Sequence, residues 1–225
     1  MVIRIAINEQ VFLKDPDSTK LGQKIVTNGI ALIDEIGFES FTFKKLAKRI
    51  GSTEASIYRY FENKHKLLIY LVSWYWNWLE YQLIFLSQNI DDSWAKFYIA
   101  IKVISQPHLL TDDQIHIDKT ALHRIVIRES PKAYLSKEVD LDNKEGYFLS
   151  YKRLCGRIAD IARTICPDYP YPRALVSTLI ESAHNQMFFA AHLPRLTDLE
   201  PENYDALTNF LSDMAERMLG SGHEK

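Results

Sequence analysis

Residues 42–61 decide the fold, and they read Thr-Phe-Lys-Lys-Leu-Ala-Lys-Arg-Ile-Gly-Ser-Thr-Glu-Ala-Ser-Ile-Tyr-Arg-Tyr-Phe. Thr42 is a good N-cap residue, and the apolar residues after it recur at the spacing of one helix face. These inward-facing positions are Leu46, Ala47 and Ile50. Gly51 follows at once, and a residue without a Cβ adopts the backbone of a tight turn at no steric cost. The first half of the stretch therefore predicts a short helix over 42–50 that ends in a reversal of the chain.

The second half of the stretch predicts another short helix. Ser52 or Thr53 is placed to cap it, and Ile57 and Tyr60 would face inward. Ala47 is small enough for two helices to cross closely. Two short helices joined by a glycine turn are the requirements of a helix-turn-helix, whose second helix enters the major groove of DNA.

A third helix is expected before this stretch. Asp17 or Ser18 can cap it, and apolar residues at helical spacing continue over 18–36. Gly37 is expected to end it. Nearer the N-terminus, Ile3, Ile5 and Ile7 alternate with other residues, which is compatible with a short strand or with an extended arm.

A long helix is expected after the stretch, opened by Asn63. Its apolar run over 67–86 has nearly the roughly 20 residues that a membrane span needs. Glu80 and other polar residues interrupt the run, and its tryptophans cluster at the centre instead of at the two ends. The pattern therefore favours a helix buried in protein on several faces, and no membrane partner is expected.

The remainder of the chain also predicts helices, because proline removes a main-chain donor and separates the periodic segments. The expected helical stretches are 92–106, 114–129, 141–165, 171–192 and 201–219. The separators are Pro107, Pro131, the run 167–172 and Pro194. Only eight glycines and eight prolines occur in 225 residues, which argues against β-sandwiches and glycine-rich nucleotide folds. The fold class is therefore predicted to be all-α.

Charge is distributed unevenly along the chain. The net charge is −2, but residues 1–66 carry 11 Lys and Arg against 8 Asp and Glu, whereas residues 67–225 carry 16 against 21. Within residues 40–66 there are seven basic residues against two acidic ones. This local excess of positive charge is suited to a polyanionic partner.

The two cysteines are not expected to pair. Cys155 and Cys166 lie 11 positions apart in a helical pattern, which separates them by about 16 Å, far beyond disulfide distance. The N-terminus lacks the order of basic, apolar and small residues that marks a signal peptide. We therefore expect a cytoplasmic protein with free thiols.

A known family shares the residues described so far. The matching segments are Gly37-Phe38, Thr-Phe-Lys-Lys-Leu-Ala over 42–47, Gly-Ser-Thr-Glu-Ala-Ser-Ile-Tyr-Arg-Tyr-Phe over 51–61, Asn63-Lys64 and Leu67-Leu68. Over about residues 18–70 the sequence resembles the DNA-binding domain of the TetR family of bacterial transcriptional regulators. The resemblance implies a homodimer, formed by the last two helices, that often binds a small effector among the middle helices.

This resemblance organises the chain into three parts. Residues 1–17 form an N-terminal arm, and residues 18–63 form a three-helix helix-turn-helix DNA-binding domain. Residues 64–225 form a larger helical domain for effector binding and dimerisation. The implied function is a sequence-specific DNA-binding transcriptional regulator, a repressor by family habit, that binds a near-palindromic operator and is released by a small apolar or aromatic molecule. No cofactor is expected.

Candidate DNA contacts follow from position in the motif. The exposed first turn of the second helix lies closest to base edges. The base-reading candidates are Lys44, Thr53, Glu54, Ala55 and Ser56, of which Lys44 follows from its family position. Positions that hold phosphates in the family correspond to Thr42, Tyr58 and Lys64, and Arg59 is added to this set. Hydroxyl and cationic groups suit phosphate binding, which is electrostatic.

Some of these residues have a second interpretation. Glu54 either accepts a bond from cytosine N4 or only favours the dipole of its helix. Tyr58 contacts phosphate or packs on its neighbours. Lys45, Lys48 and Arg49 either contact DNA or form a solvated face.

Two further sets follow from the aromatic content and from family position. The candidate effector pocket comprises Trp78, Tyr98, His123, Tyr147, Tyr151, Met187 and Phe188, although aromatic residues at helical spacing are also ordinary core. The candidate dimer face comprises Leu175, Leu179, Ala183, Phe210 and Met214.

Enzymatic and metal-binding alternatives have little support. Glu181 and His184 have the spacing of half a di-iron motif, but the other half is missing. His116 and His123 are seven residues apart, which is more typical of a structural role than of metal binding. No nucleophile, phosphate-loop or dinucleotide motif occurs, so no enzyme and no metal are predicted. A helical sensor that has lost DNA binding and a helical-bundle metalloenzyme remain as alternative classes.

Overall fold

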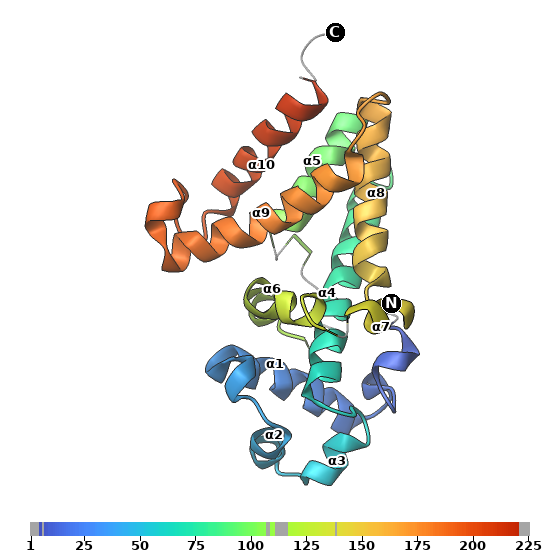
Figure 1. Cartoon of the computed structure of the whole chain (residues 1–225), viewed down its shortest axis with the longest axis vertical. Helices are drawn as coiled ribbons and strands as arrows, with labels where there is room; N and C mark the ends of the chain where they lie inside the picture. The colour runs from blue at the N-terminus through green and yellow to red at the C-terminus, as the bar shows by residue number, and fades with distance from the viewer. Residues whose placement is uncertain (1–4, 6, 107–108, 111–116, 138, 221–225) are drawn as a thin grey trace. The chain divides into compact units, whose positions relative to one another are not determined.

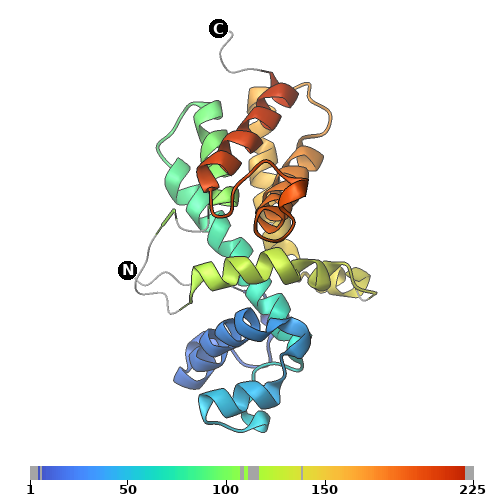
Figure 2. The same ribbon diagram turned by 90° about the vertical axis from the view of Figure 1, so that its left-hand side faces the viewer.

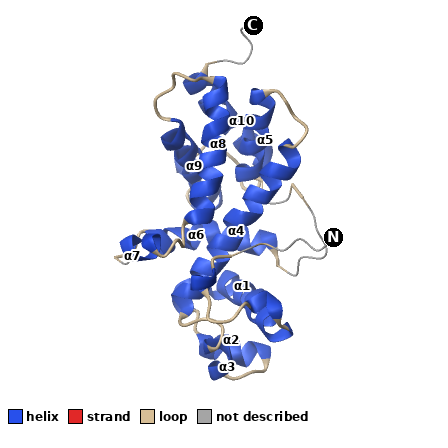
Figure 3. Ribbon diagram, turned by 90° about the vertical axis from the view of Figure 1, so that its right-hand side faces the viewer, coloured by secondary structure: helices blue, strands red, loops and turns tan. Residues whose placement is uncertain are grey.

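The computed structural model describes residues 5, 7–106, 109–110, 117–137 and 139–220. Within these residues all regular secondary structure is helical (Figure 3), which confirms the all-α prediction. The α-helices are α1 Lys20–Ser40, α2 Phe43–Ile50, α3 Glu54–Tyr58, α4 Lys64–Ser87, α5 Ser93–Ser105, α6 Lys119–Tyr134, α7 Val139–Lys144, α8 Leu149–Ile165, α9 Pro172–His192 and α10 Tyr204–Leu219. Three short 3₁₀ helices are η1 Glu9–Val11, η2 Pro16–Ser18 and η3 Pro194–Leu196.

The chain forms two compact units. The first contains Met1–Trp78 and Thr111–Ser150, and the second contains Leu79–Leu110 and Tyr151–Lys225. In the first unit, α2 and α3 lie together beneath α1, and α6 lies beside α1 (Figures 1 and 2). In the second unit, α10 packs on α5 and α9, and α5 packs on α9. The predicted boundaries at residues 17 and 63 remain a proposal about function.

The helix-turn-helix has the predicted local structure. The Thr42 hydroxyl accepts a hydrogen bond from Lys45 N at 3.2 Å and begins α2. Gly51 has φ 64° and ψ 41°, the left-handed conformation that a glycine adopts without strain. The Thr53 hydroxyl then caps α3 by accepting from Ser56 N at 3.3 Å. The inward-facing residues are buried as predicted: Leu46, Ala47, Ile50, Ile57 and Tyr60.

The helix before the motif differs from the prediction at both ends. Its N-cap is Thr19, whose hydroxyl accepts from Gly22 N at 3.0 Å, so the choice of Asp17 or Ser18 was wrong. Those two residues instead belong to η2, a 3₁₀ turn capped by Asp15. Gly37 interrupts the helix as predicted, with φ 76° and ψ 156°, but one more turn follows it as far as Ser40.

The long helix after the motif is α4. Asn63 caps it as predicted, because its side chain accepts from Lys66 N at 2.9 Å. Trp74, Trp76 and Trp78 each expose 3% or less of their surface, which confirms burial on several faces. In the described part of the chain, no helix has the length and apolarity needed to cross a bilayer.

Two predictions about the later helices were wrong. Pro131 does not separate helices but lies in the last turn of α6, where it removes only the hydrogen bond to the carbonyl one turn earlier. The single helix expected over 141–165 is two helices, α7 and α8. Gly146, with φ 78°, turns the chain between them. The helix expected over 114–129 begins at Lys119, and residues 114–116, including His116, lie outside the described residues.

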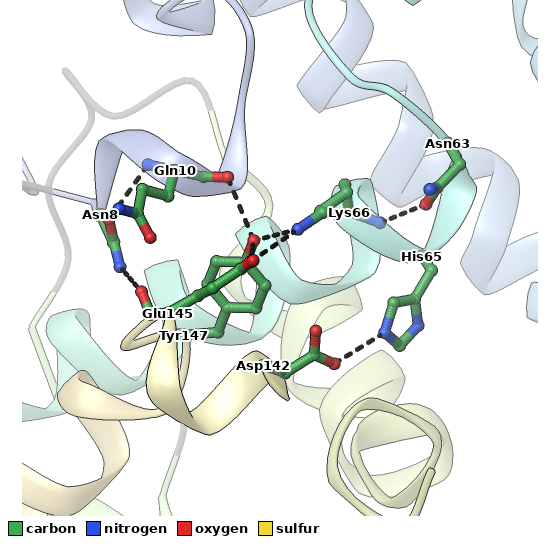
Figure 4. A network of polar contacts seen from close by, with 8 residues as sticks. All are labelled: Asn8, Gln10, Asn63, His65, Lys66, Asp142, Glu145 and Tyr147. Carbon is green, nitrogen blue, oxygen red and sulfur yellow. Dashed lines mark hydrogen bonds and ion pairs between the residues drawn. The ribbon is translucent and has the colours of Figure 1, made fainter. Parts of the chain in front are cut away.

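The N-terminal segment is anchored within the first unit. Of the three alternating isoleucines, Ile5 and Ile7 lie in no strand, and Ile3 lies outside the described residues, so the extended arm stays a prediction. Asn8 donates from Nδ2 to the Glu145 carbonyl at 2.8 Å, and the Tyr147 hydroxyl bonds to Lys66 and Glu145 (Figure 4). Leu13 N donates to the Tyr60 carbonyl at 2.8 Å. The arm therefore contacts Glu145, the residue that follows α7, and Tyr60 in the loop between α3 and α4.

Hydrogen bonds and ion pairs also connect the helices of the second unit. The buried Glu80 carboxylate bonds to Arg153 Nε at 3.0 Å and to Arg157 Nε at 2.6 Å, which joins α4 to α8. Ser105 and Thr208 share a buried hydrogen bond of 2.8 Å between α5 and α10. Cys155 and Cys166 are both free.

Candidate nucleic-acid interface

The first turn of α3 presents side chains to solvent. Thr53 and Ala55 are exposed, and Glu54 and Ser56 are half-buried. Ile57 on the opposite side is fully buried, so the helix is anchored by one face and open on the other. The Thr53 and Ser56 hydroxyls also share a hydrogen bond of 2.8 Å. That bond uses one of their two protons, so the other hydroxyl proton remains to contact a base.

The predicted phosphate-binding residues surround this turn. Thr42 and Arg59 are exposed, and Tyr58 exposes 47% of its surface. The Tyr58 ring also packs edge-on against Phe43 at 5.0 Å between centroids. Both interpretations of Tyr58 are therefore compatible with the structure, since packing of the ring leaves its hydroxyl in reach of solvent.

Lys64 has a different environment from the other members of this set. Its ammonium group donates to the carbonyls of Phe38, Glu39 and Phe41 at 3.1, 3.2 and 3.4 Å. An ammonium has three donors, and all three are used at the end of α1. A phosphate would have to replace one of these carbonyls.

The basic residues of α2 divide into two kinds. Lys44 and Lys48 are exposed. Arg49 bonds to Glu35 at 2.5 Å, and Lys45 donates to the Ser40 carbonyl at 2.7 Å. The second pair has partners on α1, so Lys44 and Lys48 are the α2 cations with the most freedom to meet DNA.

Residues 25–71 match the model of a family described as bacterial regulatory proteins, tetR family. This segment is a TetR-family helix-turn-helix domain. The match extends from the second turn of α1 into α4 and so includes all of the candidate DNA contacts. No curated protein matches the sequence.

Solved structures share the fold over nearly the whole chain. A transcriptional regulator from Rhodococcus sp. Rha1 is 14% identical, with a TM-score of 0.59 over 91% of this chain and 97% of that one. The superantigen PfiT is 14% identical, with a TM-score of 0.58 over 92% and 100%. AibR in complex with isovaleryl coenzyme A and operator DNA is 12% identical, with a TM-score of 0.54 over 88% and 98%. At these identities the likeness establishes the fold alone.

The seven predicted pocket residues are divided between the two units. Trp78, His123 and Tyr147 belong to the first unit, and Tyr98, Tyr151, Met187 and Phe188 belong to the second. Several have partners within the chain: Trp78 stacks on Trp74, His123 Nδ1 lies 2.7 Å from the Tyr75 hydroxyl, and the Tyr98 hydroxyl lies 2.5 Å from Glu216. Burial and the bond to Glu216 raise the pKa of Tyr98 to about 12.

A cavity of about 380 Å³ lies elsewhere in the first unit. It is lined by Ile5, Ile7, Glu9, Phe12, Asp15, Asp17 and Tyr70. None of the seven predicted pocket residues is among them. The pocket prediction therefore stays a proposal about the effector.

The predicted dimer face is also divided. Leu175, Leu179 and Ala183 expose 6%, 0% and 1% of their surfaces, so these α9 residues belong to the core of their own chain. On α10, Phe210 is exposed and Met214 is half-buried. The α9 side chains around a shallow surface depression are mostly polar: Ser177, Thr178, Glu181, Ser182, Asn185, Gln186 and Phe189.

A set of ion pairs between α1 and α6 was absent from the sequence predictions. Asp34 bonds to Arg124 at 2.5 Å and to Arg128 at 2.5 Å, and Lys132 bonds to Glu39 at 2.9 Å and to Glu129 at 2.8 Å. Burial raises the pKa of Asp34, but the bonds and charges of the two arginines outweigh burial, and the net pKa is lowered. The spacing of 124, 128 and 132 places them on one helix face, but the sequence does not indicate what that face meets.

Proposed function

We propose that this protein is a sequence-specific DNA-binding transcriptional regulator, and that it acts as a homodimeric repressor released by a small molecule. The observation that carries the proposal is the first turn of α3, open to solvent and surrounded by exposed cationic and hydroxyl groups. The fold alone would not suffice, since PfiT, which shares it, is a superantigen. The TetR-family match at 25–71 supports the DNA-binding part.

The base-reading and phosphate-binding roles are proposed separately. Lys44, Thr53, Glu54, Ala55 and Ser56 read bases, with Glu54 accepting from cytosine N4. The phosphate contacts are Thr42, Tyr58, Arg59 and Lys64, and Lys64 exchanges one carbonyl partner for a phosphate oxygen. Base contacts determine which sequence is bound, whereas phosphate contacts supply salt-sensitive affinity.

Dimerisation is proposed through the outward faces of α9 and α10. Phe210 and Met214 supply the apolar part on α10, whereas the buried α9 residues Leu175, Leu179 and Ala183 support this face from behind. A two-fold dimer places two recognition helices about one DNA turn apart, which corresponds to a near-palindromic operator.

Release by an effector is proposed by analogy of fold. AibR is described in complex with isovaleryl coenzyme A and operator DNA, so one protein of this fold binds both kinds of ligand. In the present chain the proposed effector is a small apolar or aromatic molecule, and each of the seven predicted pocket residues is a candidate contact within its own unit. It would act by binding more tightly to a dimer whose recognition helices are wrongly spaced for DNA.

The first experiment measures DNA binding directly. The purified protein is titrated against labelled DNA from just upstream of its own coding sequence, with fluorescence anisotropy at two salt concentrations and with scrambled competitor. Tight, salt-sensitive binding that resists the competitor supports a specific regulator. If this DNA binds no better than scrambled DNA, selection from a random-sequence library follows, and failure to enrich any sequence supports the helical sensor without DNA binding.

Variants then test the assigned contacts. Arg59→Ala should weaken binding to all sequences and reduce the slope of log affinity against log salt by about 1. Ser56→Ala should instead change the preferred sequence and leave the salt slope unchanged. Lys102→Ala is the matched charge control, because Lys102 is exposed on α5 in the second unit. Equal effects of Arg59→Ala and Lys102→Ala would contradict the phosphate assignment.

A further inference from the structure

At Gly37 the helix α1 is broken, and one main-chain hydrogen bond of a continuous helix cannot form there. In a continuous helix Phe38 N–H would donate to the Asp34 carbonyl four residues earlier. That bond depends on helical dihedrals at residue 37, and Gly37 has φ 76° and ψ 156°, a region that is essentially restricted to glycine. The donor of Phe38 and the acceptor of Asp34 are therefore both released at the end of the helix that precedes α2.

Two adjacent α6 residues take up both released groups. Phe38 N donates to Glu129 Oε1 at 3.4 Å, and Arg128 Nη2 donates to the Asp34 carbonyl at 3.4 Å. Phe38 and Glu129 expose only 6% and 7% of their surfaces, so water is a poor substitute for these partners. The bond that α1 lacks is thus replaced on each side by a side chain of α6.

Stronger ion pairs hold the two sides of the break in place. Before Gly37, the Asp34 carboxylate bonds to Arg128 at 2.5 Å and to Arg124. After Gly37, Lys132 bridges Glu39 and Glu129. These contacts hold α6 along α1 on both sides of a backbone position that has a second, helical conformation available to it.

The segment controlled by this arrangement leads directly into the DNA-binding motif. Residues 38–41 connect Gly37 to Thr42, the N-cap of α2, and Lys64 holds the carbonyls of Phe38, Glu39 and Phe41. If Glu129 were withdrawn, the Phe38 donor would lose its partner in the observed conformation. The segment would then interconvert between that conformation, in which the amide is open to exchange, and one in which Gly37 is rotated toward helical dihedrals. That rotation would change the direction of residues 38–41 relative to the rest of α1.

We propose that Arg128 and Glu129 are positioning residues for DNA binding, because they hold open the Phe38–Asp34 hydrogen bond and so set the direction in which the chain enters α2. This inference rests on the proposed function, since positioning has a purpose only if the motif binds DNA. Neither residue is proposed to touch DNA.

The test compares two substitutions at Glu129. Glu129→Ala removes the acceptor, whereas Glu129→Gln keeps one oxygen for Phe38 N–H and loses the charge and the second oxygen that pair with Lys132, which retains its bond to Glu39. Amide hydrogen exchange, measured by NMR on the full chain without DNA, reports on the Phe38 N–H directly. Glu129→Ala should accelerate exchange at Phe38 and weaken operator binding about tenfold, as expected for one buried donor left without its partner. Glu129→Gln should keep the exchange rate at Phe38 and the affinity for operator DNA within about twofold of wild type.

Two further variants separate positioning from loss of stability. Glu80→Ala removes an equally buried, ion-paired glutamate from the second unit, so it should lower stability without changing exchange at Phe38. Gly37→Ala adds a Cβ that meets nothing within 4 Å, so its only effect is to disfavour the observed backbone, and it should weaken DNA binding as Glu129→Ala does.

The outcomes distinguish this inference from the proposed function. Unchanged exchange at Phe38 in Glu129→Ala, or equal loss of DNA affinity in the Ala and Gln variants, would overturn the positioning role. The positioning role would also be overturned if Glu129→Ala bound operator DNA as tightly as wild type. Wild-type protein that binds no DNA would instead remove the proposed function and the purpose of the positioning with it.

Discussion

His184 should make the stability of this protein fall in mild acid. It lies on α9 and exposes 4% of its surface, and burial lowers its pKa from 6.5 to about 4. At pH 7.5 and above the imidazole is almost entirely neutral in both folded and unfolded chains, so it has little effect on the pH dependence there. As the pH falls below 6.5, His184 becomes protonated in the unfolded chain but stays neutral in the folded chain until about pH 4. Unfolding therefore becomes more favourable.

The size of this effect follows from the two pKa values. Between pH 7.5 and pH 5, the difference in proton binding amounts to about 2 kcal/mol of unfolding free energy. That is a large fraction of the stability of an ordinary domain. A neutral substitute at position 184 would not contribute this term at any pH.

The assay compares wild type with His184→Gln by chemical denaturation at the two pH values. The substitution has the same packing cost at both pH values, and the other six histidines contribute equally to both proteins. The pH-induced change in unfolding free energy therefore differs between the two proteins only by the contribution of His184. Wild type should lose about 2 kcal/mol more than the variant on going to pH 5. If the two proteins lose equal stability, the folded state accepts a proton at His184 and the argument from burial is refuted.

Two glycines give a second pair of predictions, one conformational and one steric. Gly51→Ala adds a Cβ that meets nothing within 4 Å, so it should cost only about 1 kcal/mol for the left-handed backbone, measured by chemical denaturation. Gly22→Ala places a Cβ 2.2 Å from the Pro16 carbonyl oxygen, so the main chain of η2 must move and the loss of stability should be greater. An equal or smaller loss for Gly22→Ala would show that the N-terminal arm adjusts without cost.

The features that the sequence predicted well depend on residues close together in the chain. Thr42, Thr53 and Asn63 cap their helices by hydrogen bonds to amides three residues ahead. Gly51 supplies its turn through its own dihedrals. Such contacts involve only residues close together in the sequence, which is why the helix-turn-helix could be recognised before any tertiary contact was known.

The wrong predictions arose where a local signal had two outcomes. Thr19 was as good a cap as Asp17 or Ser18, and the packing of η2 against α1 selected it. Pro131 looked like a boundary, but the helix continues to Tyr134 because only one hydrogen bond is lost so near its end. Gly146 divides the helix expected over 141–165, and a lone glycine inside a periodic pattern did not distinguish a break from a tolerated residue.

The sequence by itself determined the fold class, the helix-turn-helix and the set of residues that the motif presents outward, because these follow from periodicity, caps and a glycine turn. Only the tertiary structure showed that Lys64 binds three carbonyls of α1, that the predicted α9 face is buried, and that α6 replaces the hydrogen bond opened at Gly37. Phe38 and Glu129 are 91 residues apart. The sequence shows that a donor will be released at Gly37, but its partner is determined only when distant helices pack together.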